Sequence, residues 1–250
     1  MDGTLTPARQ QMSLEMARAL GKLSEKHEVG IVTGSGLDYV MEQCSILKEV
    51  FSINWDNIHL MPCNGTQWYK FKDRKLVCIH SADMKSKLGR ETYQRIVSRL
   101  CYEQSIAVAS FSEDLEFFGT FIQYRKSLLN WCPIGRDSDD DTDARKRFID
   151  FDKKTGFREK KLKELEVING DEVTVVLGGH TSFDIYPNGW DKTYALNHFD
   201  VMKTGKIVFV GDRCTGTGND RTIYEACLPD AFQTDSPEST LKIIQRFLNE

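Results

Sequence analysis

Long apolar runs are absent from this 250-residue sequence, in which no stretch approaches the roughly 18 apolar residues of a membrane span. The first residues also lack the basic and apolar regions of a signal peptide. A strong charge of either sign is absent too, because the formal net charge is −4, which gives no reason to expect a nucleic acid or an anionic membrane as partner. We therefore expect a cytoplasmic protein that binds neither.

Paired cysteines are also lacking. The cysteines number seven, which is odd, and no two of them form a Cys-x-x-Cys motif. They are Cys44, Cys63, Cys78, Cys101, Cys132, Cys214 and Cys227. A zinc site or a disulfide framework is therefore not expected, and a reducing compartment suits the chain. Buried structural thiols are favoured over functional ones.

Hydrophobic periodicity predicts helices over residues 14–23, 38–47, 85–102, 190–198 and 220–226, and a C-terminal helix from Pro237. It predicts strands over residues 29–33, 59–62, 67–71, 76–80, 117–124, 127–132, 173–177, 182–186 and 207–210. The charged segment 137–166 is predicted to be mostly helical.

The order of these elements changes twice along the chain. Residues 1–82 alternate strands and helices, which is typical of a parallel α/β sheet, and this alternation returns over residues 187–250. Residues 83–186 instead combine helices with antiparallel strands. We therefore predict an α/β fold with a Rossmann-like parallel-sheet core made from both ends of the chain. An inserted α+β cap completes it, and ligands are expected in the cleft between them.

Asp2-Gly3-Thr4 has the spacing of a turn between a strand and a loop. The glycine lets the backbone approach a phosphate closely, and an Asp just past a strand end can reach the entering or leaving oxygen. An ordinary Asp-Gly turn is the alternative. Thr33 and Ser35 also follow a predicted strand, where they suit either a phosphate or the cap of a helix.

Asp212 follows the predicted strand 207–210 and begins a glycine-rich loop that ends at Asp220. A carboxylate at the carboxyl end of a parallel strand faces the ligand crevice, and its hard oxygens suit Mg²⁺. A loop that merely caps the next helix is the alternative. Lys192 would offset the charge of these carboxylates and of a phosphate, unless it is simply an exposed helix lysine.

The predicted cap contains Arg125, Arg136 and Arg145, whose guanidinium groups suit bidentate phosphate binding. Ordinary surface positions are the alternative for each of them, above all for Arg145 in its charged segment. Ser182 and Asp184 share one face of a predicted strand and could hold sugar hydroxyls. An ordinary half-exposed strand is the alternative there.

Taken together, these motifs resemble the eukaryotic-type phosphomannomutases, members of the haloacid-dehalogenase (HAD) superfamily with an inserted cap. The similarity lies in residues 2–10 (Asp-Gly-Thr-Leu-Thr-Pro-Ala-Arg-Gln), 130–136 (Asn-Trp-Cys-Pro-Ile-Gly-Arg), 178–192 (Gly-Gly-His-Thr-Ser-Phe-Asp-Ile-Tyr-Pro-Asn-Gly-Trp-Asp-Lys), 210–212 (Val-Gly-Asp) and 218–220 (Gly-Asn-Asp). The third stretch is long and specific to the family, whereas Gly-Asp is general to the superfamily. The chain departs from the family pattern at residues 124–127 and at Cys132. At Ala226 it lacks an acid that would help to hold a second cation.

The resemblance implies a role for each matching residue. Asp2 would be the general acid/base and would lend its backbone carbonyl to Mg²⁺, while Asp212 would bind Mg²⁺ through its side chain, with Asp220 close behind. Lys192 would lie near the attacking residue. The substrate would be held by Arg9, Arg125, Arg136, Arg145, Ser182 and Asp184.

The family motif also contains an attacking Asp two residues before the acid/base, and this position would lie upstream of Met1. The strand that carries it would lie between residues 29–33 and 207–210, and without it two strands would lose their ladder partners. We therefore expect that the first core strand is missing from this chain and that the natural protein starts earlier.

By the same resemblance, the expected activity is interconversion of mannose 6-phosphate and mannose 1-phosphate, which supplies GDP-mannose synthesis. It would proceed through an aspartyl-phosphate and a hexose bisphosphate, the latter also acting as activator. Mg²⁺ would be the cofactor, and a homodimer through the cap is a further expectation. A HAD-type sugar phosphatase and a non-catalytic sugar-phosphate-binding protein are the alternatives.

Overall fold

The computed structural model describes residues 1–140, 142–169, 172–199 and 205–249. The chain forms two compact units. The core unit comprises Met1–Ser81 and Trp190–Glu250, and the cap unit comprises Ala82–Gly189. Helices and strands alternate in the core unit, so the predicted α/β class is confirmed. No helix in the described ranges is both long and apolar enough to cross a membrane.

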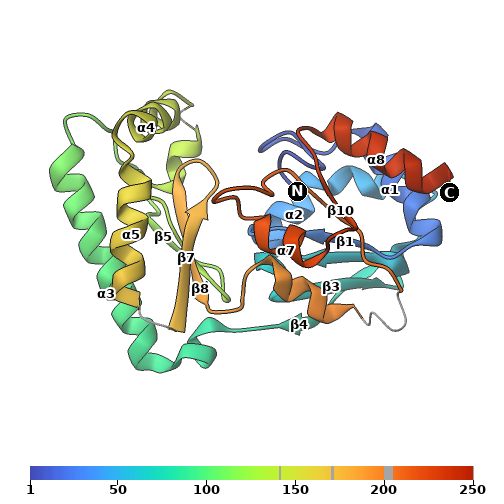
Figure 1. The fold of residues 1–250 in the computed structure, drawn as a ribbon, viewed down its shortest axis with the longest axis horizontal. Coiled ribbons are helices and arrows are strands. Elements are labelled where there is room, and N and C mark those ends of the chain that lie inside the picture. Colours follow the sequence, from blue (N-terminus) through green and yellow to red (C-terminus); the bar gives the residue numbers. More distant parts are fainter. Residues whose placement is uncertain (141, 170–171, 200–204, 250) are drawn as a thin grey trace. The chain divides into compact units, whose positions relative to one another are not determined.

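The core unit contains two separate sheets (Figure 1). In the first, β1 (Val29–Val32) pairs in parallel with β2 (Ile58–Met61), and the antiparallel strands β3 (Gln67–Lys72) and β4 (Lys75–Ser81) continue it. In the second, β9 (Phe209–Gly211) pairs in parallel with β10 (Ala231–Gln233). The remaining elements are α1 (Leu14–Lys26), α2 (Leu37–Gln43), α7 (Arg221–Ala226) and α8 (Pro237–Asn249).

Helix α1 begins where the side chain of Ser13 accepts a hydrogen bond from the backbone N–H of Met16 at 3.1 Å. Its apolar residues recur at helical spacing, so Met16 and Leu20 lie on one buried face. Figure 1 shows α1 beside α8, and Leu241 and Ile244 of α8 join the same hydrophobic core.

The cap unit is an antiparallel sheet with the strand order β5-β6-β8-β7. Its strands are β5 (Ile122–Tyr124), β6 (Leu129–Trp131), β7 (Val173–Gly178) and β8 (Ser182–Pro187). Its helices are α3 (Met84–Phe111), α4 (Thr142–Thr155) and α5 (Phe157–Asn169), of which α3 and α5 lie along the sheet (Figure 1). Trp131 and Phe183 stack with ring centroids 4.9 Å apart and are completely buried.

Some local predictions differ from the structure. The strand expected over 117–124 covers only Ile122–Tyr124. The helix expected over 190–198 is a 3₁₀ helix over Lys192–His198, which begins where the Asp191 carboxylate accepts the N–H of Thr193 at 2.8 Å. The helix expected over 38–47 ends at Gln43 and gives way to a 3₁₀ turn over Ser45–Glu49. Strand β10 was not predicted, because three residues are too few for a periodic pattern.

We expect Met16→Ala to destabilise the core unit by about 2–5 kcal/mol, because the side chain is completely buried and its removal leaves a cavity. The control is Leu14→Ala on the same helix, whose side chain is 38% exposed and whose loss should cost less than about 0.5 kcal/mol. Urea unfolding followed by circular dichroism measures both. Equal losses of stability would contradict this description of the core.

Candidate functional site

Asp2 lies in a tight loop that holds its carboxylate from three directions. The hydroxyl of Tyr39 donates to Oδ1 at 2.8 Å, and the hydroxyl of Thr6 donates to the same oxygen at 3.4 Å. The backbone N–H of Arg9, an exposed residue, also donates to Oδ1 at 3.3 Å. Burial and then the contact with Asp2 raise the pKa of Tyr39, so its hydroxyl stays a donor at all ordinary pH values.

Asp212 comes directly after β9 and packs against the Asp2 loop. Its Oδ1 accepts a hydrogen bond from the hydroxyl of Thr4 at 3.2 Å. Gly3 has φ +75°, and a Cβ at that position would lie 2.5 Å from Oδ2 of Asp212. A glycine is therefore required both by the backbone conformation and by the close approach of the carboxylate. Burial raises the pKa of Asp212, and the negative charge of Asp220 raises it further.

Lys192 and Asp220 form a buried ion pair in the core unit. Lys192 is 5% exposed and Asp220 is 4% exposed, and Nζ of the lysine contacts Oδ1 of the aspartate. Oδ2 of Asp220 accepts the backbone N–H of Arg213 at 3.2 Å. Burial alone would raise the pKa of Asp220, but the adjacent ammonium group outweighs it and holds that pKa below its ordinary range. Lys192 is therefore not the exposed helix lysine of the alternative interpretation.

These groups form one electrostatic cluster in the core unit. The charges of Asp220 and Lys192 both act on Asp212, and the charge of Lys192 also acts on Asp220. Gly3 and Thr4, which directly follow Asp2, contact Asp212. The structure thus brings together Asp2, Lys192, Asp212 and Asp220, which come from three separate stretches of the sequence.

A second polar cluster lies on the cap sheet and is centred on Asn130. Its side-chain amide donates to Oδ1 of Asp184 at 2.7 Å and to Oγ of Ser182 at 3.0 Å, and all three residues are buried. Its carbonyl oxygen accepts a hydrogen bond from Nη1 of Arg136 at 3.2 Å. Gly178 provides the space, because a Cβ there would lie 2.8 Å from Oγ of Ser182. The structure therefore brings Arg136, Ser182 and Asp184 together.

The other two cap arginines lie on different elements. Arg125 follows β5, and its Nε donates to Oε1 of Gln123 at 2.9 Å. Gln123 is the ladder partner of Asn130, so their side chains lie on one face of the sheet. Arg145 lies in α4 and is half-buried.

The sequence motifs do not indicate two residues of these clusters, Tyr39 and Gln123. Gln123 could have been found, because it lies two residues before Arg125 on a strand and therefore shares its face. Tyr39 could not, because only the path of α2 in the folded chain brings its hydroxyl to Asp2. Thr4 and Thr6 belong to a recognised motif, but their carboxylate partners became visible only in the structure.

The oxygen donors around Asp2 and Asp212 fit a small hard cation. The Asp212 carboxylate lies close to the backbone at Gly3, and Mg²⁺ prefers carboxylate and carbonyl oxygens as ligands. The described residues contain no group of three or more His, Cys, Asp or Glu side chains arranged to hold a metal. A cation here would therefore need backbone carbonyls and ligand oxygens as further partners.

Two solved structures have a fold similar to that of this chain. A Plasmodium falciparum IMP-nucleotidase has 15% sequence identity and a TM-score of 0.65 over 99% of this chain, which spans 58% of that longer chain. A trehalose-6-phosphate phosphatase related protein has 15% identity and a TM-score of 0.50, covering 99% of this chain and 94% of its own. At such identities the likeness shows the fold alone, and it supports the predicted HAD-type architecture.

Curated relatives are similar over nearly their whole length. The phosphomannomutase of Schizosaccharomyces pombe is 32% identical over 253 residues, which cover 100% of this chain and 92% of the relative. The phosphomannomutase of Saccharomyces cerevisiae is 31% identical, with the same coverage of both chains. Human phosphomannomutase 1 is 32% identical over 97% of this chain and 87% of its own. The family model "Eukaryotic phosphomannomutase" matches residues 16–250, and the chain therefore belongs to the eukaryotic phosphomannomutase family.

Proposed function

We propose that this protein interconverts mannose 6-phosphate and mannose 1-phosphate through an aspartyl-phosphate and a hexose bisphosphate, and so supplies GDP-mannose synthesis in the cytoplasm. The observation that carries the proposal is the Asp2 carboxylate, held by three donors in a chain of this family. Its relatives bear the name phosphomannomutase. We also propose that the protein forms a homodimer through the cap unit, because the family resemblance implies one.

Asp2 would act as the general acid/base. Tyr39, Thr6 and the N–H of Arg9 all donate to Oδ1, which fixes the orientation of the carboxylate and leaves Oδ2 to exchange a proton with a sugar hydroxyl. Such preorganisation costs nothing at the moment of reaction. The attacking Asp expected upstream of Met1 stays a prediction.

Mg²⁺ would be held by the backbone carbonyl of Asp2 and the side chain of Asp212, and it would supply charge stabilisation to the transferring phosphoryl group. Gly3 allows the Asp212 carboxylate to approach the backbone that follows Asp2. Lys192 places a positive charge beside the same carboxylates, with Asp220 fixing its position. The cation and Lys192 together would therefore offset the negative charge of these carboxylates and of the bound phosphate.

The cap residues would hold the part of the substrate that does not react. Arg125, Arg136 and Arg145 would bind phosphate, with Arg9 assisting from the Asp2 loop. Ser182 and Asp184 would bind sugar hydroxyls in an orientation set by Asn130. A mutase needs this second phosphate-binding site because its intermediate carries two phosphates. The contact between Arg136 and Asn130 supports such a site in the cap unit.

The proposal is tested by phosphorus NMR with mannose 6-phosphate, Mg²⁺ and a catalytic amount of hexose bisphosphate. Residues 1–250 alone should bind the bisphosphate in a Mg²⁺-dependent manner without turnover. The same chain preceded by an apolar strand ending in Asp-Met should form mannose 1-phosphate, because the attacking carboxylate is then present. The matched control ends in Asn-Met and should stay inactive.

Other outcomes of this experiment separate the alternatives. Release of inorganic phosphate without mannose 1-phosphate would indicate a phosphatase. Binding without turnover by the Asp-containing chain would indicate a non-catalytic sugar-phosphate-binding protein. Turnover by residues 1–250 alone would show that the expectation of an upstream attacking Asp is wrong.

Arg136→Lys should weaken binding of hexose bisphosphate about tenfold, because lysine keeps the charge but loses the guanidinium fork. The matched control is Arg147→Lys, which replaces a half-exposed cap arginine that pairs with Glu116 and should leave affinity unchanged. Isothermal titration with the bisphosphate measures both variants. Equal affinity of Arg136→Lys and the parent chain would contradict the role of Arg136.

Lys192→Met should destabilise the core unit by about 3–5 kcal/mol at pH 7, because it leaves the buried Asp220 carboxylate without its partner. In the parent chain, the lowered pKa of Asp220 makes the pair stabilising above about pH 4. This contribution is lost as the pH falls toward the lowered pKa. The variant should lose this dependence and become relatively more stable in acid, where the carboxyl group is neutral.

Urea unfolding between pH 7 and pH 3 measures this effect. Lys206→Met serves as the control, because its pair with Asp230 leaves the lysine 63% exposed and should contribute less than about 1 kcal/mol. A pH profile that is unchanged by Lys192→Met would show that the pair does not behave as its burial requires.

A further inference from the structure

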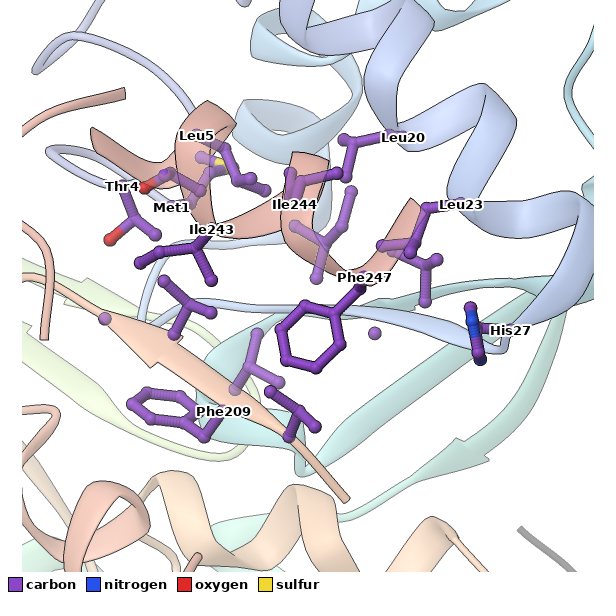
Figure 2. A pocket seen from close by; sticks show the side chains of 18 of the residues that line it. Met1, Thr4, Leu5, Leu20, Leu23, His27, Phe209, Ile243, Ile244 and Phe247 are labelled. Atoms are coloured by element: carbon purple, nitrogen blue, oxygen red, sulfur yellow. The ribbon is translucent and has the colours of Figure 1, made fainter. Parts of the chain in front are cut away.

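An apolar cavity of the core unit is a poor site for a charged ligand. This pocket of about 520 Å³ is lined mainly by apolar side chains, among them Leu20, Leu23 and Phe247 (Figure 2). Such a lining offers a phosphate few donors to replace those of water. The cap sheet instead carries arginines beside polar side chains. The proposed function assigns no role to one of these polar side chains, that of Gln123.

Gln123 holds the side chain of Arg125. Its Oε1 accepts a hydrogen bond from Nε of Arg125 at 2.9 Å, and both residues are half-buried. A guanidinium group is planar and carries five N–H donors in a fixed arrangement. A bond to Nε therefore restricts the plane of the whole group and the directions of its other N–H groups. The contact orients a positive charge that is proposed to bind phosphate.

The backbone of Arg125 is held as well. Its N–H donates to the carbonyl of Leu128 at 2.9 Å, and its own carbonyl accepts the N–H of Ser127 at 2.7 Å, so a tight turn joins β5 to β6. This turn is attached to the start of α3, where the N–H of Met84 donates to the carbonyl of Lys126 at 2.9 Å. The freedom that remains to Arg125 therefore lies mainly in its side chain.

Gln123 belongs to a polar row that crosses three strands of the cap sheet. It is the ladder partner of Asn130 on β6, which is itself the partner of Asp184 on β8. Neighbouring strands lie about 4.8 Å apart, so the ends of this row are about 10 Å apart. Asn130 accepts a hydrogen bond from Nη1 of Arg136 at 3.2 Å. Two facing amide side chains thus each hold an arginine that is proposed to bind phosphate.

An amide differs from a carboxylate as the partner of such an arginine. Elsewhere in the cap unit Arg147 pairs with the carboxylate of Glu116 at 2.9 Å. A carboxylate partner offsets the positive charge of an arginine and repels a phosphate. The amide oxygen of Gln123 accepts an N–H without bringing a negative charge. This contact therefore orients Arg125 and leaves its charge available to attract an anion.

We infer that Gln123 is a positioning residue that acts through Arg125, holding its guanidinium group in place for the phosphate that does not react. The inference rests on the proposed function, in which Arg125 binds phosphate. A side chain that is ordered before the ligand arrives loses less entropy on binding. Without the amide oxygen, Arg125 keeps its charge but has to be ordered by the ligand itself.

The test is isothermal titration of residues 1–250 with a hexose bisphosphate and Mg²⁺. Gln123→Met keeps the length of the side chain but removes the acceptor, and it should weaken binding about fivefold, the usual effect of one neutral hydrogen bond. Gln123→Glu keeps an acceptor but adds a negative charge, and it should weaken binding further. The matched control is Gln94→Met at an exposed position of α3, which should leave affinity unchanged. Equal affinity of Gln123→Met and the parent chain would overturn the inference.

A double-mutant cycle separates action through Arg125 from a general effect on the fold. Lysine has no Nε donor, so in an Arg125→Lys chain the added change Gln123→Met should cause no further loss of affinity. A further fivefold loss in that background, of the size estimated for one hydrogen bond, would overturn the inference.

The contact also has a spectroscopic signature that needs no ligand. The Nε–H signal of Arg125 in ¹H–¹⁵N NMR spectra, assigned by its loss in Arg125→Lys, should shift in Gln123→Met because its acceptor is gone. An unshifted signal would overturn the inference.

Failure of the proposed function gives a different result. A parent chain that does not bind the hexose bisphosphate would overturn the proposed function and this inference together. Binding by the parent chain with equal affinity of Gln123→Met would overturn this inference alone. Urea unfolding of each variant is measured in parallel, and lowered affinity with an unchanged unfolding midpoint supports the positioning role.

Discussion

Lys192 and Asp220 are almost completely buried, and each would be costly to keep charged without the other. Their contact joins the start of the 3₁₀ helix over Lys192–His198 to the start of α7. The second oxygen of Asp220 also binds the N–H of Arg213, so the pair fixes the loop that follows β9. Asp212 lies at the beginning of that loop, and its place beside Gly3 therefore depends on a charge pair formed eight residues further along the chain.

In the cluster of Asp2, Lys192, Asp212 and Asp220, the position of Asp212 could be predicted because this residue follows a strand. Asp212 comes directly after an apolar strand, and the carboxyl ends of parallel strands are where polar groups converge. The partners could not be predicted in the same way. Tyr39 reaches Asp2 only through the path of α2, and the pairing of Lys192 with Asp220 joins segments whose separation in space no periodicity reveals. Strand β10 is likewise too short to leave a pattern.

In the cap sheet, too, some site residues could be predicted from the sequence and others could not. Alternation along β8 placed Ser182 and Asp184 on one face, as the sequence indicated. The register across the sheet adds Asn130 and Gln123 to that face, and this register comes from strand pairing rather than from the pattern of any single strand. Because Asn130 donates to Asp184 and accepts from Arg136, it couples the groups proposed for the sugar to a group proposed for the phosphate. A change at Asn130 would therefore disturb both.

The cluster of Asp2, Lys192, Asp212 and Asp220 carries more negative than positive charge, and this excess limits what it can bind. Asp2, Asp212 and Asp220 contribute three carboxylates, and Lys192 already pairs with one of them. A phosphate brought to this cluster would add further negative charge in a partly buried setting, where repulsion is weakly screened. Burial and the charge of Asp220 raise the pKa of Asp212, which is the direction that such crowding produces. A cation that binds Asp212 would reduce this repulsion, and the charges of this chain therefore agree with the proposal of a Mg²⁺ cofactor.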